Sequence, residues 1–191
     1  MTDRTDNQDF PANVIQAARE ILSQGICLLE SIDNQVYTIV VPEAFDSTIG
    51  AHYRHCLDHF SCFLAGISGS GINYDHRQRD TVQENDRFAA LNRSREIMEE
   101  ITQLASDNPH DQPVQVTSKI SYTDASSQKA GSTLSRELMY VVSHAMHHFA
   151  LIRIMSRLLD VSLPAQFGVA PSTLQHQHTA ARFKDVEALS E

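Results

Sequence analysis

The sequence predicts an all-α fold, a four-helix bundle with a long crossover between its second and third helices and a short β-hairpin-like insertion before its fourth. Four long segments repeat apolar residues at three- and four-residue steps, which is the period of an amphipathic helix. Seven glycines and six prolines among 191 residues are few for a fold made of many tight turns. We expect one domain over residues 1–191, in which residues 1–9 and about 165–191 are peripheral or flexible.

The first helix is expected over residues 12–32, because its apolar residues from Val14 to Leu29 follow the helical period. An Asp-Asn pair at residues 33–34 ends this helix. Residues 35–41 then alternate briefly between polar and apolar side chains, so this connection is expected to be extended.

The second helix is expected over residues 48–67, where Asp46 or Ser47 can cap its start. Glycines close it, and residues 68–80 that follow are rich in turn-forming side chains. This segment is too long for a tight connection between adjacent antiparallel helices. It is therefore expected to form the long crossover to the third helix.

A third helix follows the crossover and runs to about residue 105, with a predicted buried stripe that includes Phe88 and Leu91. Residues 114–122 next alternate between apolar and polar side chains, which is typical of a short exposed strand. The return arm of a hairpin is expected within residues 124–132, where turn-forming Asp, Ser and Gly are frequent.

The fourth helix is expected over residues 134–160, a stretch without Gly or Pro that keeps the helical period. His144 and His148 are four residues apart, about 40° around the helix axis, so both imidazoles project from one face. One helix uses this spacing to offer two nitrogens to one metal ion. His147 is expected beside such a site, or at its rim, rather than as a ligand.

A second stripe of histidines lies on the second predicted helix, where His52, His55 and His59 are three and four residues apart. Helix bundles commonly build metal sites from inward-facing residues of neighbouring helices. His144 and His148 would then supply two nitrogens, and one histidine of the second helix a third. The spacing does not decide which one, and it leaves open an interpretation in which the histidines only form hydrogen bonds.

Charge and composition argue against several classes of function. The net charge of −9, from 24 acidic and 15 basic residues, disfavours nucleic-acid binding because no basic face offsets phosphate repulsion. The N-terminus lacks the features of a signal peptide, and no segment approaches the roughly 18 apolar residues of a membrane span. The three cysteines include no C-x-x-C pair, which fits a reducing compartment better than a disulfide framework, so we expect a cytoplasmic protein. From the charge and the hydropathy we expect neither nucleic-acid nor membrane partners.

The two histidine stretches resemble motifs of the DinB-like superfamily, also called YfiT-like. They read Ser-Thr-Ile-Gly-Ala-His-Tyr-Arg-His-Cys-Leu-Asp-His from residue 47 and Ser-His-Ala-Met-His-His-Phe from residue 143. The resemblance implies a four-helix bundle that holds a divalent metal by one histidine of the second helix and an H-x-x-x-H pair of the fourth. In the family's motif the ligand follows a helix-starting Ser by about two turns, which implies His55 with His144 and His148; His52 or His59 could replace or join His55.

The resemblance also implies Zn²⁺ or Ni²⁺ as the ion, frequent homodimerisation and, in some branches, transfer reactions that use low-molecular-weight thiols. A three-histidine site open to water or substrate favours a metal-dependent hydrolase or a thiol-dependent transferase that acts on a small molecule. Glu137 and Tyr140 precede His144 on the same face and are candidate catalytic groups. The alternative is a non-catalytic metal-binding or dimerisation module.

Overall fold

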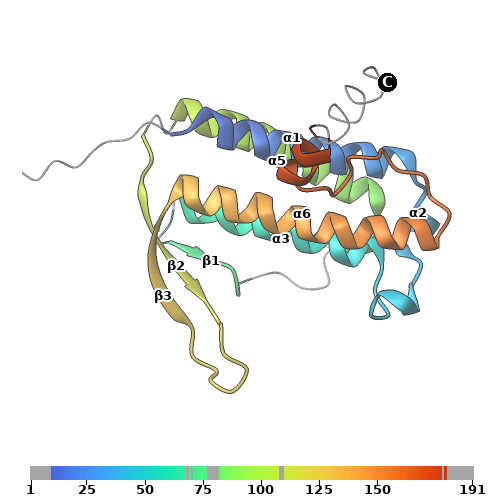
Figure 1. The fold of residues 1–191 in the computed structure, drawn as a ribbon. Coiled ribbons are helices and arrows are strands. Elements are labelled where there is room, and N and C mark those ends of the chain that lie inside the picture. The colour runs from blue at the N-terminus through green and yellow to red at the C-terminus, as the bar shows by residue number, and fades with distance from the viewer. Residues whose placement is uncertain are drawn as a thin grey trace, which may run out of the picture.

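Helices predominate in the structure, and a small three-stranded sheet is its other regular element (Figure 1). This confirms the prediction of a mostly helical protein. The computed structural model describes residues 10–67, 69, 71–76, 82–107, 110–177 and 179. The N-terminal residues 1–9 and most of the C-terminal segment beyond residue 177, both predicted to be peripheral, lie outside the described residues.

Four long helices dominate the described fold, namely α1 (Ala12–Ser31), α3 (Ile49–Ile67), α5 (Arg87–Asp107) and α6 (Leu134–Leu158). Helix α1 packs against α5 and α6, and α3 packs against the same two helices. Figure 1 shows α1 beside α5 and α3 beside α6, with the two pairs lying one above the other. The first, second and fourth of these helices end within two residues of their predicted ends.

The predicted extended connection after α1 is wrong, because residues Asn34–Thr38 form the short helix α2. The side chain of Asp33 accepts a hydrogen bond from the backbone N–H of Val36 at 2.8 Å and so caps a new helical turn. The second long helix is capped differently from the prediction as well. Its capping oxygen is Oγ1 of Thr48, which accepts from the N–H of Ala51 at 2.9 Å.

The predicted hairpin is present, as strands β2 (Pro113–Ser118) and β3 (Gln128–Thr133) pair in antiparallel fashion. A third strand, β1 (Ile72–Asn73), pairs with β2 in parallel, with Ile72 opposite Val116. The sequence did not predict β1, which lies within the crossover. Thr133 ends β3 and caps α6, because its side chain accepts from the N–H of Arg136. The sheet therefore adjoins the first turns of α6 (Figure 1).

Two further short elements lie between the long helices, the 3₁₀ helix η1 (Pro42–Ala44) and the helix α4 (Val82–Asn85) that precedes α5. On α5 the predicted buried stripe needs one correction, since the side chain of Phe88 is 61% exposed. The neighbouring Ala90 is fully buried and takes the inward position at that turn.

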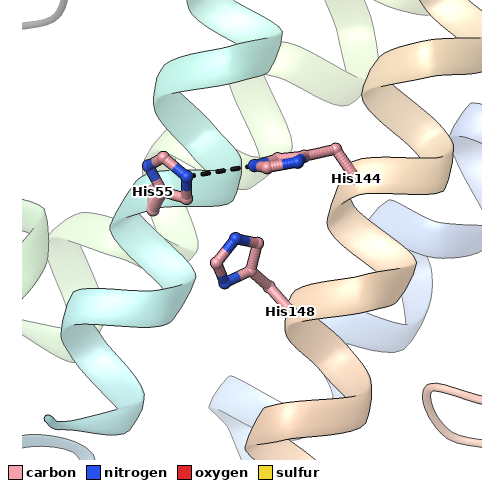
Figure 2. Close-up of side chains that lie close together, drawn as sticks. All are labelled: His55, His144 and His148. Atoms are coloured by element: carbon pink, nitrogen blue, oxygen red, sulfur yellow. Dashed lines mark hydrogen bonds between the residues drawn. The ribbon is translucent and has the colours of Figure 1, made fainter. Parts of the chain in front are cut away.

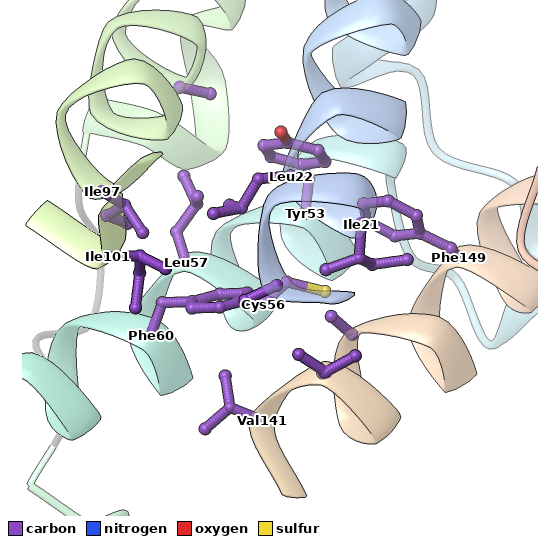
Figure 3. Close-up of a cluster of buried hydrophobic side chains, with 14 of the residues drawn as sticks. Ile21, Leu22, Tyr53, Cys56, Leu57, Phe60, Ile97, Ile101, Val141 and Phe149 are labelled. Atoms are coloured by element: carbon purple, nitrogen blue, oxygen red, sulfur yellow. The ribbon is translucent and has the colours of Figure 1, made fainter. Parts of the chain in front are cut away.

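The core lies between the four long helices, each of which contributes apolar side chains to it (Figure 3). Its members include Ile21 and Leu22 of α1, Tyr53, Cys56, Leu57 and Phe60 of α3, Ile97 and Ile101 of α5, and Val141 and Phe149 of α6. The hydroxyl of Tyr53 is fully enclosed there and shares a hydrogen bond of 2.9 Å with Ser94 Oγ. Phe167, beyond α6, stacks on Phe149 at 5.0 Å between ring centroids and extends this core.

Candidate metal centre

Two adjacent helices carry six histidines, namely His52, His55 and His59 on α3 and His144, His147 and His148 on α6. Each helix turns an apolar stripe to the core, with Tyr53 and Phe60 on α3 and Val141 and Phe149 on α6. The half-buried histidines occupy the stripe next to it, where α3 and α6 contact each other. The packing of the apolar faces therefore brings the two histidine stripes together.

Three of these histidines form a group that could hold a metal ion (Figure 2). They are His55, His144 and His148, and one ring nitrogen from each lies within 4.8 Å of the other two. Nε2 of His55 and Nε2 of His144 are 3.0 Å apart. Two imidazole nitrogens bound at about 2.0–2.1 Å to one tetrahedral ion lie about 3.3 Å apart, so this separation fits a shared ion. The donor set, three half-buried imidazoles, suits a divalent transition-metal ion.

The other three histidines surround this group without belonging to it. Nδ1 of His52 lies 3.0 Å from Nδ1 of His148. His59 is buried, and its Nδ1 donates to the backbone carbonyl of His55 at 3.0 Å. Its ring also packs on His144, with 4.0 Å between centroids and 30° between planes. His147 is exposed, as expected for a residue at the rim.

Burial keeps two rings of the cluster in the neutral state. Burial, followed by repulsion from His144 and His52, lowers the pKa of His148 to about 3. Burial, followed by repulsion from His147, also lowers the pKa of His52. Both imidazoles are therefore uncharged near pH 7, and a neutral imidazole keeps the lone pair that metal binding requires.

The candidate Glu137 lies in the first turn of α6, where its side chain is buried and well supplied with donors. The hydroxyl of Tyr74 donates to its Oε2 at 2.9 Å, and Ser132 Oγ donates to its Oε1 at 2.6 Å. Arg136 adds a longer contact to Oε1 at 3.4 Å. These hydrogen bonds connect Ser132 of strand β3 and Tyr74, which follows β1, to α6. Glu137 therefore fixes the sheet against the helix that carries His144.

The candidate Tyr140 contacts the histidine cluster directly. Its ring stacks on His144 with 5.8 Å between centroids, and it lies 5.1 Å from the ring of Tyr74. Tyr74 in turn stacks on His59 at 5.4 Å. The two tyrosines thus form an aromatic layer between the histidines and the sheet. On its far side lies a cavity of about 340 Å³, whose lining includes both tyrosines, Glu137 and Arg136.

Sequence reasoning missed Tyr74, which connects Glu137 with His59. Tyr74 directly follows the two-residue strand β1, and its N–H donates to the carbonyl of Thr117 in β2. A two-residue strand is too short for an alternating pattern to indicate it. Burial and the neighbouring Glu137 carboxylate raise the pKa of Tyr74, so its hydroxyl keeps its proton and acts as a donor.

Comparison with known proteins identifies the family. A model of the DinB family matches residues 8–168, so the chain belongs to the DinB family. Over 105 residues the chain is 40% identical to FK506-binding protein 5 of Rhizopus delemar. That match covers 55% of this chain and 27% of the relative, so the chain spans about a quarter of the relative's length. Among the described residues, no helix is long and apolar enough to cross a membrane.

Proposed function

We propose that this protein binds one divalent metal ion through His55, His144 and His148 and leaves a coordination position open to water or substrate. The observation that carries the proposal is the convergence of three half-buried imidazole nitrogens within 4.8 Å of one another. Membership of the DinB family supports it, as does the resemblance of the H-x-x-x-H pair on α6 and of the histidine stretch on α3 to the metal-binding motifs of the DinB-like superfamily. Zn²⁺ or Ni²⁺ is the proposed ion, since imidazole ligands suit both.

We further propose that the site is catalytic and acts on a small molecule, either by metal-dependent hydrolysis or by thiol-dependent transfer. A divalent ion held by three imidazoles supplies Lewis acidity and lowers the pKa of water or of a thiol that it binds. The protein's own part is to orient the ligands. The rings of His59 and Tyr140 both pack against His144, with 4.0 Å and 5.8 Å between centroids, and so restrict the orientation of this ligand ring.

The aromatic layer and the cavity behind it favour a small-molecule substrate at this end of the molecule. The cavity is lined by Val116 and Ile120 of the hairpin region and by Tyr74, Arg136 and Glu137, so it combines apolar walls with a few polar groups. Pockets of this composition are typical of small-molecule sites. Tyr140 is the proposed link between the cavity and the metal centre, because its side chain lines the cavity and its ring stacks on the candidate ligand His144.

A non-catalytic metal-binding module is the second candidate, and the comparison with the Rhizopus delemar protein favours it. The matched stretch is about a quarter of that longer relative, as expected if such a region serves as one module of a larger protein. A catalytic site requires that the ion keep one coordination position open to exchange, next to a pocket that can hold a substrate. A non-catalytic module requires neither.

The test combines elemental analysis with activity measurements on protein purified without a histidine tag. We expect about one equivalent of divalent metal per chain, lost in His55→Ala, His144→Ala and His148→Ala. Metal content that is unchanged in all three variants would refute the proposed metal site. A panel of hydrolytic and thiol-transfer assays on the loaded protein then separates the candidates, since a module would bind the ion with no turnover in either class.

The remaining parts of the proposal concern architecture and assembly. We propose that α1, α3, α5 and α6 form a DinB-type four-helix bundle and that the chain forms a homodimer in the cytoplasm. The bundle is supported by the contacts of α1 and α3 with both α5 and α6. Light scattering coupled to size exclusion tests the dimer, and a mass of one chain at micromolar concentration would contradict it.

A further inference from the structure

The contact between His52 and His148 joins a residue outside the metal-binding group to one of the three candidate ligands. The two Nδ1 atoms lie 3.0 Å apart, within hydrogen-bonding distance. Because Nδ1 of His148 is engaged there, the nitrogen that His148 can offer to an ion is Nε2. Figure 2 agrees, since one ring nitrogen of His148 points toward the space between His55 and His144.

The direction of this hydrogen bond decides whether His148 can be a ligand. A hydrogen bond between two neutral imidazole nitrogens contains one proton, so one ring donates and the other accepts. If His148 donates, its proton lies on Nδ1 and its Nε2 keeps a free lone pair. If His52 donates instead, neutral His148 carries its proton on Nε2 and has no lone pair to offer toward His55 and His144.

We propose that His52 is a positioning residue of the metal centre, whose Nδ1 accepts the Nδ1–H of His148 and thereby presents Nε2 of His148 to the ion. The inference rests on the proposed metal site and assigns it a fourth histidine that is not itself a ligand. Ligand imidazoles usually donate their second N–H to a carboxylate or a carbonyl. Here the acceptor would be another imidazole, contributed by the opposite helix.

The surroundings of His52 leave this role open to it. Its Nε2 is buried and has no hydrogen-bond partner among the residues that the structure describes. No other hydrogen bond from these residues therefore fixes which nitrogen of His52 carries the proton. The ring planes of His52 and His148 are tilted by 43° with 5.3 Å between centroids, so the two rings meet through their nitrogens rather than by stacking.

Two substitutions separate an acceptor role from a merely structural one. Leu at position 52 fills similar space without an acceptor, whereas Asn places a carbonyl oxygen near the position of Nδ1. Metal affinity is measured in tag-free protein by competition of Zn²⁺ and Co²⁺ with a chromophoric chelator, and the visible spectrum of bound Co²⁺ reports the ligand set. We expect His52→Leu to bind about 10–100-fold more weakly and His52→Asn to recover most of that loss. The Co²⁺ spectrum should keep its shape, because the three ligands remain.

Each other outcome overturns a defined part of the argument. If the wild-type protein binds no ion, the proposed metal site fails and this inference fails with it. If the wild type binds one ion and His52→Leu binds it equally well, or if His52→Asn binds it as weakly as His52→Leu, only the positioning role fails. A changed Co²⁺ spectrum in His52→Leu would make His52 a ligand and also overturn the role.

A nuclear magnetic resonance measurement tests the same point without a variant. In metal-loaded wild-type protein labelled with ¹⁵N-histidine, long-range ¹⁵N–¹H correlation spectra identify the protonated nitrogen of each ring. We expect a proton on Nδ1 of His148 and none on Nδ1 of His52. A His148 ring whose Nδ1 lacks a proton in the loaded protein would refute the proposal, whatever the folding of the variants.

Discussion

Replacement of His148 by Leu should reduce the acid sensitivity of the metal-free protein. The pKa of His148 is about 3 in the folded protein, mainly because of burial, against about 6.5 for an unperturbed histidine. Above pH 6.5 the ring is neutral in both states and its protonation does not affect stability. Between pH 6.5 and 3 the unfolded chain binds a proton that the folded protein does not, so stability falls as the pH is lowered.

The size of the effect follows from these two values. At pH 4.5, two pH units below the unfolded pKa, a fully shielded ring would cost about 2.7 kcal/mol. His148 is only half-buried, so solvent screening reduces the expected loss to about 1 kcal/mol. The His148→Leu variant has no such ring and should lose about 1 kcal/mol less between pH 7.5 and 4.5.

The assay is urea unfolding of metal-free protein with a chelator present, at pH 7.5 and pH 4.5. The variant His176→Leu serves as a matched control, because this histidine is exposed on a helical segment beyond α6. The control should show the same pH dependence as the wild type. Equal losses of unfolding free energy in wild type and His148→Leu would refute the reasoning, since they would mean that burial does not disfavour the charged ring.

Two further predictions concern the core and the thiols. Gly25→Ala should lower the unfolding free energy by about 1–2 kcal/mol, because overpacking outweighs the better helix propensity of Ala. The new Cβ would strike the Tyr53 hydroxyl and lie 2.9 Å from the Tyr53 ring. A urea midpoint at or above that of the wild type would contradict this prediction. Cys27 should react with a chromogenic disulfide reagent in the native protein, and Cys56 should not. The reason is that Cys27 is exposed, whereas Cys56 is buried and burial raises the pKa of its thiol. Peptide mapping that finds native Cys56 labelled as fast as Cys27 would contradict this prediction.

The sequence was most informative where one periodic pattern covered a long segment. The helix that carries His144 and His148 was predicted with its start at Leu134, because some 25 residues repeat their apolar positions without interruption. The same periodicity placed the second histidine stripe, on α3, so the convergence of His55 with the pair on α6 could be expected. Periodicity alone left open which of the three α3 histidines joins that pair; the resemblance implied His55, and His55 is the one whose ring nitrogen lies near those of His144 and His148.

The sequence was least informative where short segments depend on tertiary contacts. The strand that precedes Tyr74 exists because it pairs with β2, more than 40 residues later, and no local pattern reveals such a partner. The helix α2 was missed for a related reason, because five residues are too few to show a helical period and a single cap at Asp33 starts the helix. The approach of His52 to His148 depends on ring orientations that helical spacing does not specify.

The central claim is that His55, His144 and His148 bind one divalent ion, and a crystal structure of the metal-loaded protein tests it most directly. Data collected on both sides of the absorption edges of zinc and nickel identify the ion by anomalous scattering. We predict one anomalous peak per chain, about 2.0–2.1 Å from one ring nitrogen of each of the three histidines. No peak at this position in crystals grown with excess metal, or a peak held by other residues, would contradict the claim.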